Sequence, residues 1–182
     1  TFTCIRSLIG GCVLIPIVLI RKRKESGAKD RLEGDEKKEY EEKVNRLLLV
    51  AGVLSGVLLA IAQNLQQIGI TKTTVGKAGF ITAMYIVLVP IFGLLLKKKT
   101  SMFVWIGVIF ATWGLYLLNM TSTGEGVQEW SIGFGEIMVL LCAVFFALQI
   151  LVIDHFLPKV DDVTMACIQF FVCGILSVIV II

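Results

Sequence analysis

Charged residues are scarce in this chain of 182 amino acids. Asp, Glu, Lys and Arg make up only 17% of the sequence, whereas 57% of it is hydrophobic and the mean hydropathy is +0.88. Soluble domains contain about 25% charged and about 45–50% apolar residues, and a small fold cannot bury such an excess of apolar surface. The composition therefore excludes an ordinary soluble enzyme, a disordered tail and a secreted disulfide scaffold, and it predicts an integral membrane protein.

Residues that build metal and catalytic sites are also few. The chain has one histidine, His155, and its five cysteines form no C-x-x-C pair, so we expect no metal and no other cofactor. It contains no G-x-S-x-G, phosphate-binding-loop or H-E-x-x-H motif, so no catalytic residue is predicted and the chain is not expected to be an enzyme. The net charge of +3 is small and the basic residues are dispersed, which argues against a nucleic-acid partner.

Long apolar runs, by contrast, are abundant. A membrane helix needs about 20 mainly apolar residues. The apolar residues here surround the helix instead of alternating along a strand, and helices satisfy their own backbone hydrogen bonds in lipid. We therefore predict an all-α membrane protein, a polytopic bundle whose partner is the lipid bilayer. Six transmembrane helices are expected, at Phe2–Ile20, Leu47–Ile70, Ala78–Leu96, Met102–Met120, Ile132–Ile153 and Val163–Ile182.

Basic residues lie mainly on one side of these helices. The segments that share this side hold ten, three and one Lys or Arg, fourteen in all, and they are residues 21–46, 97–101 and 154–162. The segments between the other helix ends hold only Lys72 and Lys77. Because Lys and Arg gather in cytoplasmic loops, we expect the three basic segments to be cytoplasmic in a multi-pass protein of the cell (plasma) membrane. The first helix would then run inward from the outer side.

The charged cytoplasmic loop 21–46 carries a helical pattern at its end. Glu39 and Lys43, like Glu42 and Arg46, are four residues apart, which is the spacing of ion pairs on a helix. We expect the following helix to extend from the membrane into water.

The first and last apolar runs resemble each other. Thr, Cys, Ile and Gly recur at a constant offset of 163, at Thr1, Cys4, Ile5 and Gly11 and at Thr164, Cys167, Ile168 and Gly174. Five crossings separate the two runs, so they point in opposite directions, which is typical of inverted-repeat transporters. Chance similarity of two apolar helices is the alternative. The chain lacks an initial Met and a signal peptide, so we expect an internal fragment of a longer protein.

Four carboxamides lie within five residues of the second run. Gln63 and Gln67 continue the helix face of Gly52 and Gly56, while Asn64 and Gln66 flank it. The G-x-x-x-G spacing favours close helix packing, and polar side chains in hydrocarbon tend to face a bundle interior or a water-filled cavity. We expect Gln63, Asn64 and Gln67 to line a substrate path. The alternative is that these amides only bond helices together.

Other helices supply further candidates. Thr82 and Tyr85 share one face of the third run, and Pro90 is expected to kink it. Gln149, in the fifth run, is a weaker path candidate. Gly107 and Gly114, in the fourth, are predicted to serve helix packing.

Six further segments follow one another in a recognisable order and spacing, and they are Gln67–Thr82, Tyr85–Phe92, Trp105–Gly107, Gly114–Leu118, Gly135–Ile137 and Ala143–Gln149. Together they resemble the EamA-type drug/metabolite transporters. The resemblance implies ten helices in two inverted five-helix repeats around a central cavity. The first repeat would occupy 1–120 without its first helix, and 132–182 would begin the second. The chain departs from the family pattern at Lys97-Lys98-Lys99, where an acidic–basic pair is common.

The predicted function is secondary transport of a small-molecule solute, namely a metabolite, an amino acid or a drug, by alternating access. One alternative is a membrane-embedded enzyme or lipid-handling protein whose reactive residues lie outside this segment. Another is a membrane adaptor that uses the charged loop. The sequence indicates no substrate, transport direction, coupling ion or oligomeric state.

Overall fold

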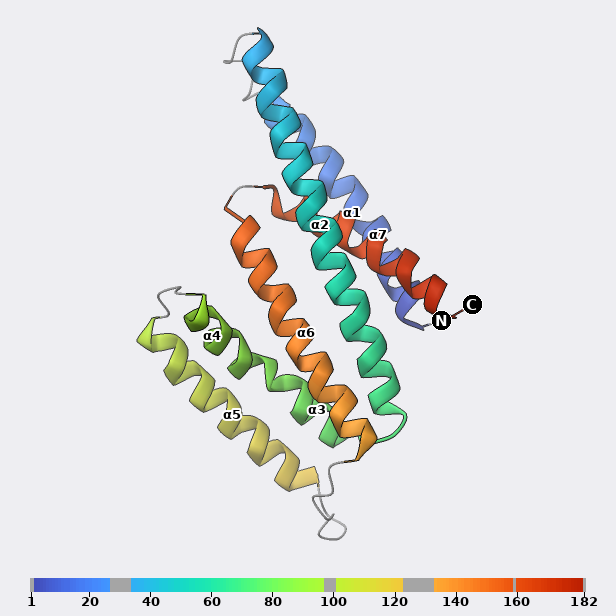
Figure 1. The fold of residues 1–182 in the computed structure, drawn as a ribbon, viewed down its shortest axis with the longest axis vertical. Helices are drawn as coiled ribbons and strands as arrows, with labels where there is room; N and C mark the ends of the chain where they lie inside the picture. Colours follow the sequence, from blue (N-terminus) through green and yellow to red (C-terminus); the bar gives the residue numbers. More distant parts are fainter. Residues whose placement is uncertain (1, 27–33, 97–100, 123–132, 159, 182) are drawn as a thin grey trace. The chain divides into compact units, whose positions relative to one another are not determined.

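The fold is a bundle of α-helices. A computed structural model describes residues 2–26, 34–96, 101–122, 133–158 and 160–181, and within them it contains helices and no strand (Figure 1). This confirms the predicted all-α class. The helices are α1 (Phe2–Ser26), α2 (Gly34–Ile70), α3 (Val75–Ala83), α4 (Tyr85–Leu95), α5 (Met102–Ser122), α6 (Phe134–Phe156) and α7 (Asp162–Ile181).

Most of these helices are long and apolar enough to cross a membrane. Five such spans occur in the described residues, and they are Thr3–Ile20, Glu42–Ile70, Val75–Leu95, Phe134–Phe156 and Asp162–Ile179. The sixth predicted span is α5, a helix of 21 residues whose apolar stretch is described from Met102 to Gly114. The protein is therefore a multi-pass membrane protein.

Two segments differ from their sequence-based description. The predicted loop 21–46 is largely helical, because α1 continues to Ser26 and α2 begins at Gly34; residues 27–33 lie outside the described part. The Lys, Arg and Glu residues there are good helix formers and are spaced for ion pairs, so the helices extend beyond their apolar runs, as expected for the start of α2.

The third span is interrupted, but not at its proline. Met84 separates α3 from α4, with a ψ of −18°, and its N–H bonds to the Ile81 carbonyl three residues back. Pro90 lies inside α4, whose helical structure continues to Leu95. The ring of a proline acts on the carbonyl four residues back, here that of Ile86 inside α4, so Pro90 does not account for the irregularity at Met84.

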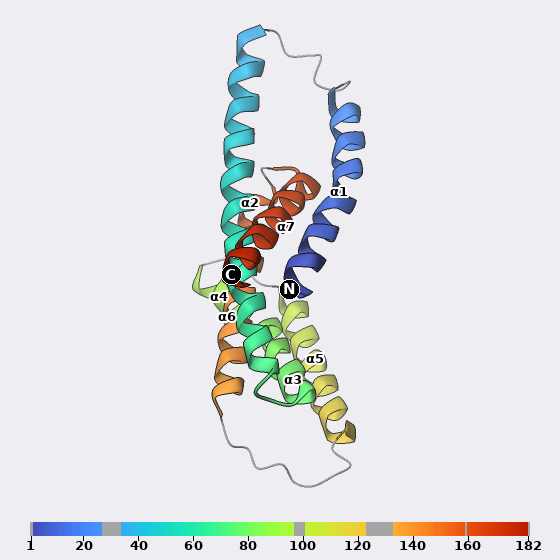
Figure 2. The same ribbon diagram turned by 90° about the vertical axis from the view of Figure 1, so that its right-hand side faces the viewer.

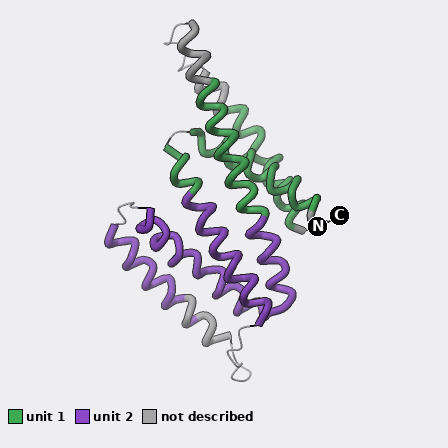
Figure 3. Tube along the Cα trace, viewed as in Figure 1, with its two compact units in different colours: residues 1–60, 152–182 green, residues 61–151 purple. Residues whose placement is uncertain are grey.

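The described chain forms two compact units (Figure 3). Unit 1 comprises residues 1–60 and 152–182, and unit 2 comprises residues 61–151. The units are defined by compactness in space, whereas the repeats predicted at 1–120 and 132–182 are defined by topology, and these repeats stay a prediction.

In unit 1, α7 packs against α1 and against the middle of α2, at Gly52 and Gly56 (Figures 1 and 2). Ser7 contacts Cys173 and Gly11 contacts Cys167, so α1 and α7 run in opposite directions. Because lipid offers no hydrophobic force between helices, such contacts rest on close packing and hydrogen bonds.

In unit 2, the last turns of α2 pack against the first turns of α6, and α3 and α4 pack against α5. Glycine makes the first contact possible. A methyl group added at Gly69 would overlap Val139, and one added at Gly135 would lie 2.9 Å from the backbone carbon of Lys72. The turn between α2 and α3 is thereby held on α6.

Candidate functional site

Polar side chains meet around the interruption at Met84. On its N-terminal side, the Gln66 amide on α2 donates a hydrogen bond of 3.4 Å to the Thr82 hydroxyl on α3. On its C-terminal side, the ring of Tyr85 lies 6.1 Å from that of Phe146 on α6, tilted by 49°. Residues from α2, α3, α4 and α6 therefore flank one irregular turn within an apolar span.

The four carboxamides of α2 differ in exposure. Gln63 is buried, with 7% of its surface exposed, while Asn64 and Gln66 are half-buried and Gln67 is exposed. Gln67 is three residues from the end of α2 at Ile70, on a side that the described helices leave exposed, whereas Gly69, two residues further on, is buried. The described contact to Thr82 is made by Gln66, which the face argument had placed at the margin.

Gln149 is also buried, with 6% of its surface exposed, on α6 of the same unit. The residue belongs to the apolar span Phe134–Phe156. Burial of a polar group is costly unless it is hydrogen-bonded, so buried amides in a span favour an interior or path-lining role over a lipid-facing one.

The four glycines expected to serve helix packing fall into two groups. A methyl group added at Gly52 would lie 2.7 Å from the Ile168 side chain, and one added at Gly56 would lie 2.9 Å from the Gln169 carbonyl oxygen, both on α7. Methyl groups at Gly107 and Gly114 on α5 would have no described atom within 4 Å. The α2 glycines thus approach a neighbour closely, and the α5 glycines do not approach any described helix.

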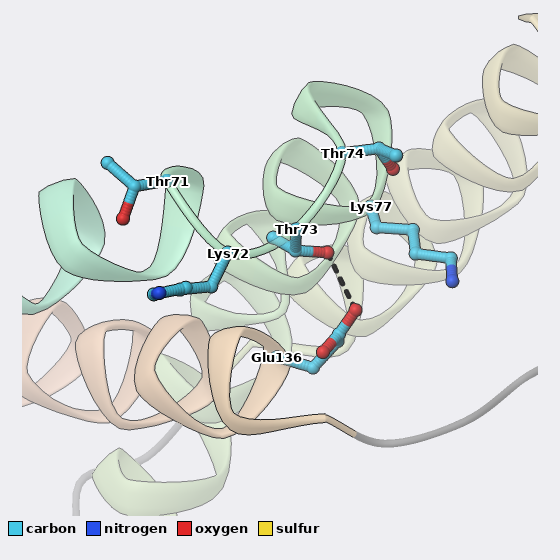
Figure 4. Close-up of a pocket in the computed structure, with 6 residues that line it drawn as sticks. All are labelled: Thr71, Lys72, Thr73, Thr74, Lys77 and Glu136. Atoms are coloured by element: carbon cyan, nitrogen blue, oxygen red, sulfur yellow. Dashed lines mark hydrogen bonds between the residues drawn. The ribbon is translucent and has the colours of Figure 1, made fainter.

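A polar pocket of ≈ 550 Å³ opens where α2 ends and α3 and α6 begin, on the side predicted to be external (Figure 4). The Thr73 hydroxyl donates a hydrogen bond of 2.7 Å to one Glu136 oxygen, and the Gly133 N–H donates one of 3.0 Å to the other. Lys72 and Lys77 extend in different directions from this contact. The residues that line the pocket are Thr71, Lys72, Thr73, Thr74, Lys77 and Glu136.

The Thr73–Glu136 contact was not predicted. Its residues are 63 positions apart, and a hydrogen bond of that kind leaves no periodic pattern. Part of it could have been read from the sequence: a Glu in the first helical turn often reaches back to a backbone N–H at the helix start, as Glu136 does to Gly133.

Unit 1 contains buried polar residues that the sequence reasoning also missed. The Ser7 hydroxyl donates to the Cys173 sulfur at 3.5 Å, and Ser55 donates to the Gly52 carbonyl at 3.2 Å. The Ser177 hydroxyl has no hydrogen-bond partner among the described atoms. Ser and Thr can bond within their own helix, so their isolated presence in apolar runs carries little signal. The set is Thr3, Ser7, Ser55, Gln169 and Ser177.

Most of the cysteines are buried within the helices. Cys4, Cys142, Cys167 and Cys173 are buried as free thiols, and Cys12 is exposed. In the described residues no three His, Cys, Asp or Glu side chains come together as a group that could hold a metal ion.

The apolar helices, some of which carry buried amides, define a polytopic α-helical membrane protein. The chain matches the EamA-like transporter family over residues 1–120. It is also 32% identical over 132 residues to a protein of Archaeoglobus fulgidus named "Uncharacterized transporter", an alignment that covers 69% of this chain and 39% of that relative. The chain thus spans well under half the length of this relative. No solved structure matches it. The protein belongs to the EamA-like transporter family.

Proposed function

We propose that the complete protein is a secondary transporter that carries a small polar solute across the plasma membrane by alternating access. Membership of the EamA-like transporter family supports the general activity. The solute would be a metabolite, an amino acid or a drug that offers hydrogen-bonding groups.

One structural observation carries the proposal. The Gln66–Thr82 hydrogen bond lies beside the helix interruption at Met84, inside the apolar span Val75–Leu95. Transporters place solute sites near the bilayer midplane at discontinuous helices, where side chains and irregular backbone can exchange internal hydrogen bonds for bonds to a solute. A bond of 3.4 Å is long for a neutral pair, which is a weak internal partner for a solute to replace.

The other candidate path residues lie on α2, α4 and α6. Gln63 lies three residues before Gln66 on α2, Tyr85 begins α4, and Gln149 is buried on α6. We propose that Gln63, Asn64 and Gln67 donate to or accept from the solute, together with Thr82, Tyr85 and Gln149. Gly52 and Gly56 would hold α2 against α7. Gly107 and Gly114, which approach no described helix, would serve packing of α5 in the complete protein.

Transport itself is tested with the full-length protein in sealed vesicles. Radiolabelled amino acids, organic acids and drug-like amines are offered one at a time, and uptake is measured against concentration. A carrier gives saturable uptake of at least one class. Uptake equal to that of protein-free vesicles for every class, with folded protein present, would contradict the proposal.

A further inference from the structure

The contacts between α1 and α7 come in pairs that the 163-residue offset converts into each other. A methyl group added at Gly11 would lie 3.2 Å from the Phe171 ring, and one added at Gly174 would lie 2.9 Å from the Leu8 side chain. The offset of 163 that relates Gly11 to Gly174 also relates Leu8 to Phe171. Each contact is therefore the image of the other.

A second pair of contacts obeys the same rule. Gly10 lies against Phe170, at 3.8 Å from an added methyl group, and Ser7 bonds to Cys173 at 3.5 Å. Offset by 163, Gly10 becomes Cys173 and Ser7 becomes Phe170. The offset was set by identical residues and not by contacts, so nothing required the helices to meet in this register. Contacts in which i touches j and the image of j touches the image of i are the mark of a two-fold interface.

This interface is short and closely packed. Ser7 is 1% exposed and Cys173 is fully buried, whereas Val13 and Leu19, further along α1, are 61% and 57% exposed. The two helices thus cross at residues 7–11 and 167–174, which we call the seam, and α1 leaves α7 beyond it (Figure 2). Separating the helices there would leave the Ser7 hydroxyl without its partner in hydrocarbon.

Two-fold symmetry has a consequence for a carrier with inverted repeats. In such a carrier one repeat rocks against the other, so that the two repeats exchange roles between the outward- and inward-facing states. When the two repeats exchange roles, the Gly11–Phe171 contact takes the place of the Gly174–Leu8 contact, and the Gly174–Leu8 contact takes the place of the Gly11–Phe171 contact. Because both contacts are already present, at 3.2 and 2.9 Å, a seam that keeps them would look alike before and after the exchange.

We propose that the α1–α7 seam is the fixed pivot of the transport cycle, held in contact in both states while other contacts open and close. This inference rests on the proposed transport function. The opposing view, that the seam is a gate that parts in one state, predicts the same contacts in a single structure but a different response to cross-linking.

The test locks the seam covalently in the full-length protein. Cys173 is kept as the sole cysteine, and Ser7→Cys is added, because the 3.5 Å contact places the two sulfur atoms within reach of a disulfide after a small side-chain movement. Vesicles are treated with copper phenanthroline, the remaining thiols are counted by maleimide mass shift after denaturation, and flux is measured. The matched control carries Ser7→Cys with Cys173→Ser and receives the same oxidant.

A pivot predicts that the disulfide forms and that flux equals that of the control. Flux that falls in proportion to the cross-linked fraction, and returns with reductant, would overturn the proposal in favour of a gate. Failure of the folded protein to form the disulfide would also overturn it, because a permanent contact must cross-link. Absence of flux before oxidation would contradict transport itself, so the two failures are distinguishable.

A second pair of variants tests the symmetry without cysteine. Gly11→Leu and Gly174→Leu disrupt image contacts, so the seam predicts similar losses of melting temperature and of flux from both. Gly79→Leu is the control, because a methyl group at Gly79 would have no described atom within 4 Å. A loss from only one of the two seam variants would contradict the two-fold interface.

Discussion

The residues of the candidate path differ in how far their side chains are exposed. Gln63 is 7% exposed and Gln67 is exposed, although both were placed on one face of α2 by their spacing. The sequence supplied the residue types and the face, because helical periodicity depends on spacing alone. It could not supply the Gln66–Thr82 contact, which depends on how α3 packs beside α2.

Alanine variants of the two glutamines test the path at this scale. Loss of one or two hydrogen bonds to a solute weakens binding by about 1–3 kcal/mol, or roughly tenfold to a hundredfold. We expect Gln63→Ala to raise the Kd for the transported solute by that amount, and Gln67→Ala to raise it less, because Gln67 is exposed.

The alternative reading of these amides gives a different pattern. If they only bond helices together, Gln63→Ala lowers the unfolding free energy by about 0.6 kcal/mol and leaves solute affinity unchanged. Isothermal titration and thermal unfolding on the same preparations separate the two. Normal affinity in both variants and in the double variant would remove these residues from the path.

Among the elements, the helix ends were predicted within a few residues wherever an apolar run ended in a turn, as at Ile70 for α2 and Met102 for α5. Hydropathy failed where helices continue into water, as in α1 to Ser26, because charged residues form helix equally well. It also failed at Met84, because an interruption of one residue leaves the apolar run intact.

The junction of α2 and α6 gives a stability prediction. A methyl group at Gly69 would meet Val139 and would lie 3.0 Å from the Gly135 carbonyl oxygen, and backbone cannot move aside cheaply. Gly69→Ala should therefore lower the unfolding free energy by about 1–3 kcal/mol. The matched variant Gly79→Ala meets nothing within 4 Å and should be neutral or stabilising by up to about 1 kcal/mol. Equal melting temperatures for the two variants would show that this junction is not tightly packed.

The turn between α2 and α3 gives a prediction about local backbone stability. Thr73→Val removes the hydroxyl that donates to Glu136 and preserves the side-chain shape, so the turn should loosen from α6. Thr74→Val is the control, because Thr74 makes no side-chain cap hydrogen bond to α3. Hydrogen exchange of the backbone at residues 71–77 should accelerate in Thr73→Val and not in Thr74→Val. Identical exchange in both variants would show that the Thr73–Glu136 bond does not hold the turn.

For the whole molecule, the charge asymmetry predicts the orientation in the membrane. Fourteen Lys or Arg lie on one side and two on the other, so a single cysteine placed between residues 29 and 37 should be protected from membrane-impermeant maleimide in intact cells. A cysteine placed between residues 121 and 126 should react. The reverse pattern would invert the topology and place the Glu136 pocket in the cytoplasm.

The family and its fold class followed from composition and from the order of short segments, because both depend on the chain as a whole. The pivot did not, because the sequence resemblance between the first and last runs carries no information about which helices touch. The contacts of Gly11 and Gly174 connect that resemblance with the packing of α1 against α7.

Alternating access is the central claim, and counterflow tests it most directly. Vesicles containing the full-length protein are loaded with unlabelled solute and diluted into a trace of labelled solute. A carrier that exposes one site to one side at a time predicts a transient accumulation of label above its external concentration. Entry of label at a rate independent of the internal solute, as through an open pore, would contradict alternating access in this protein.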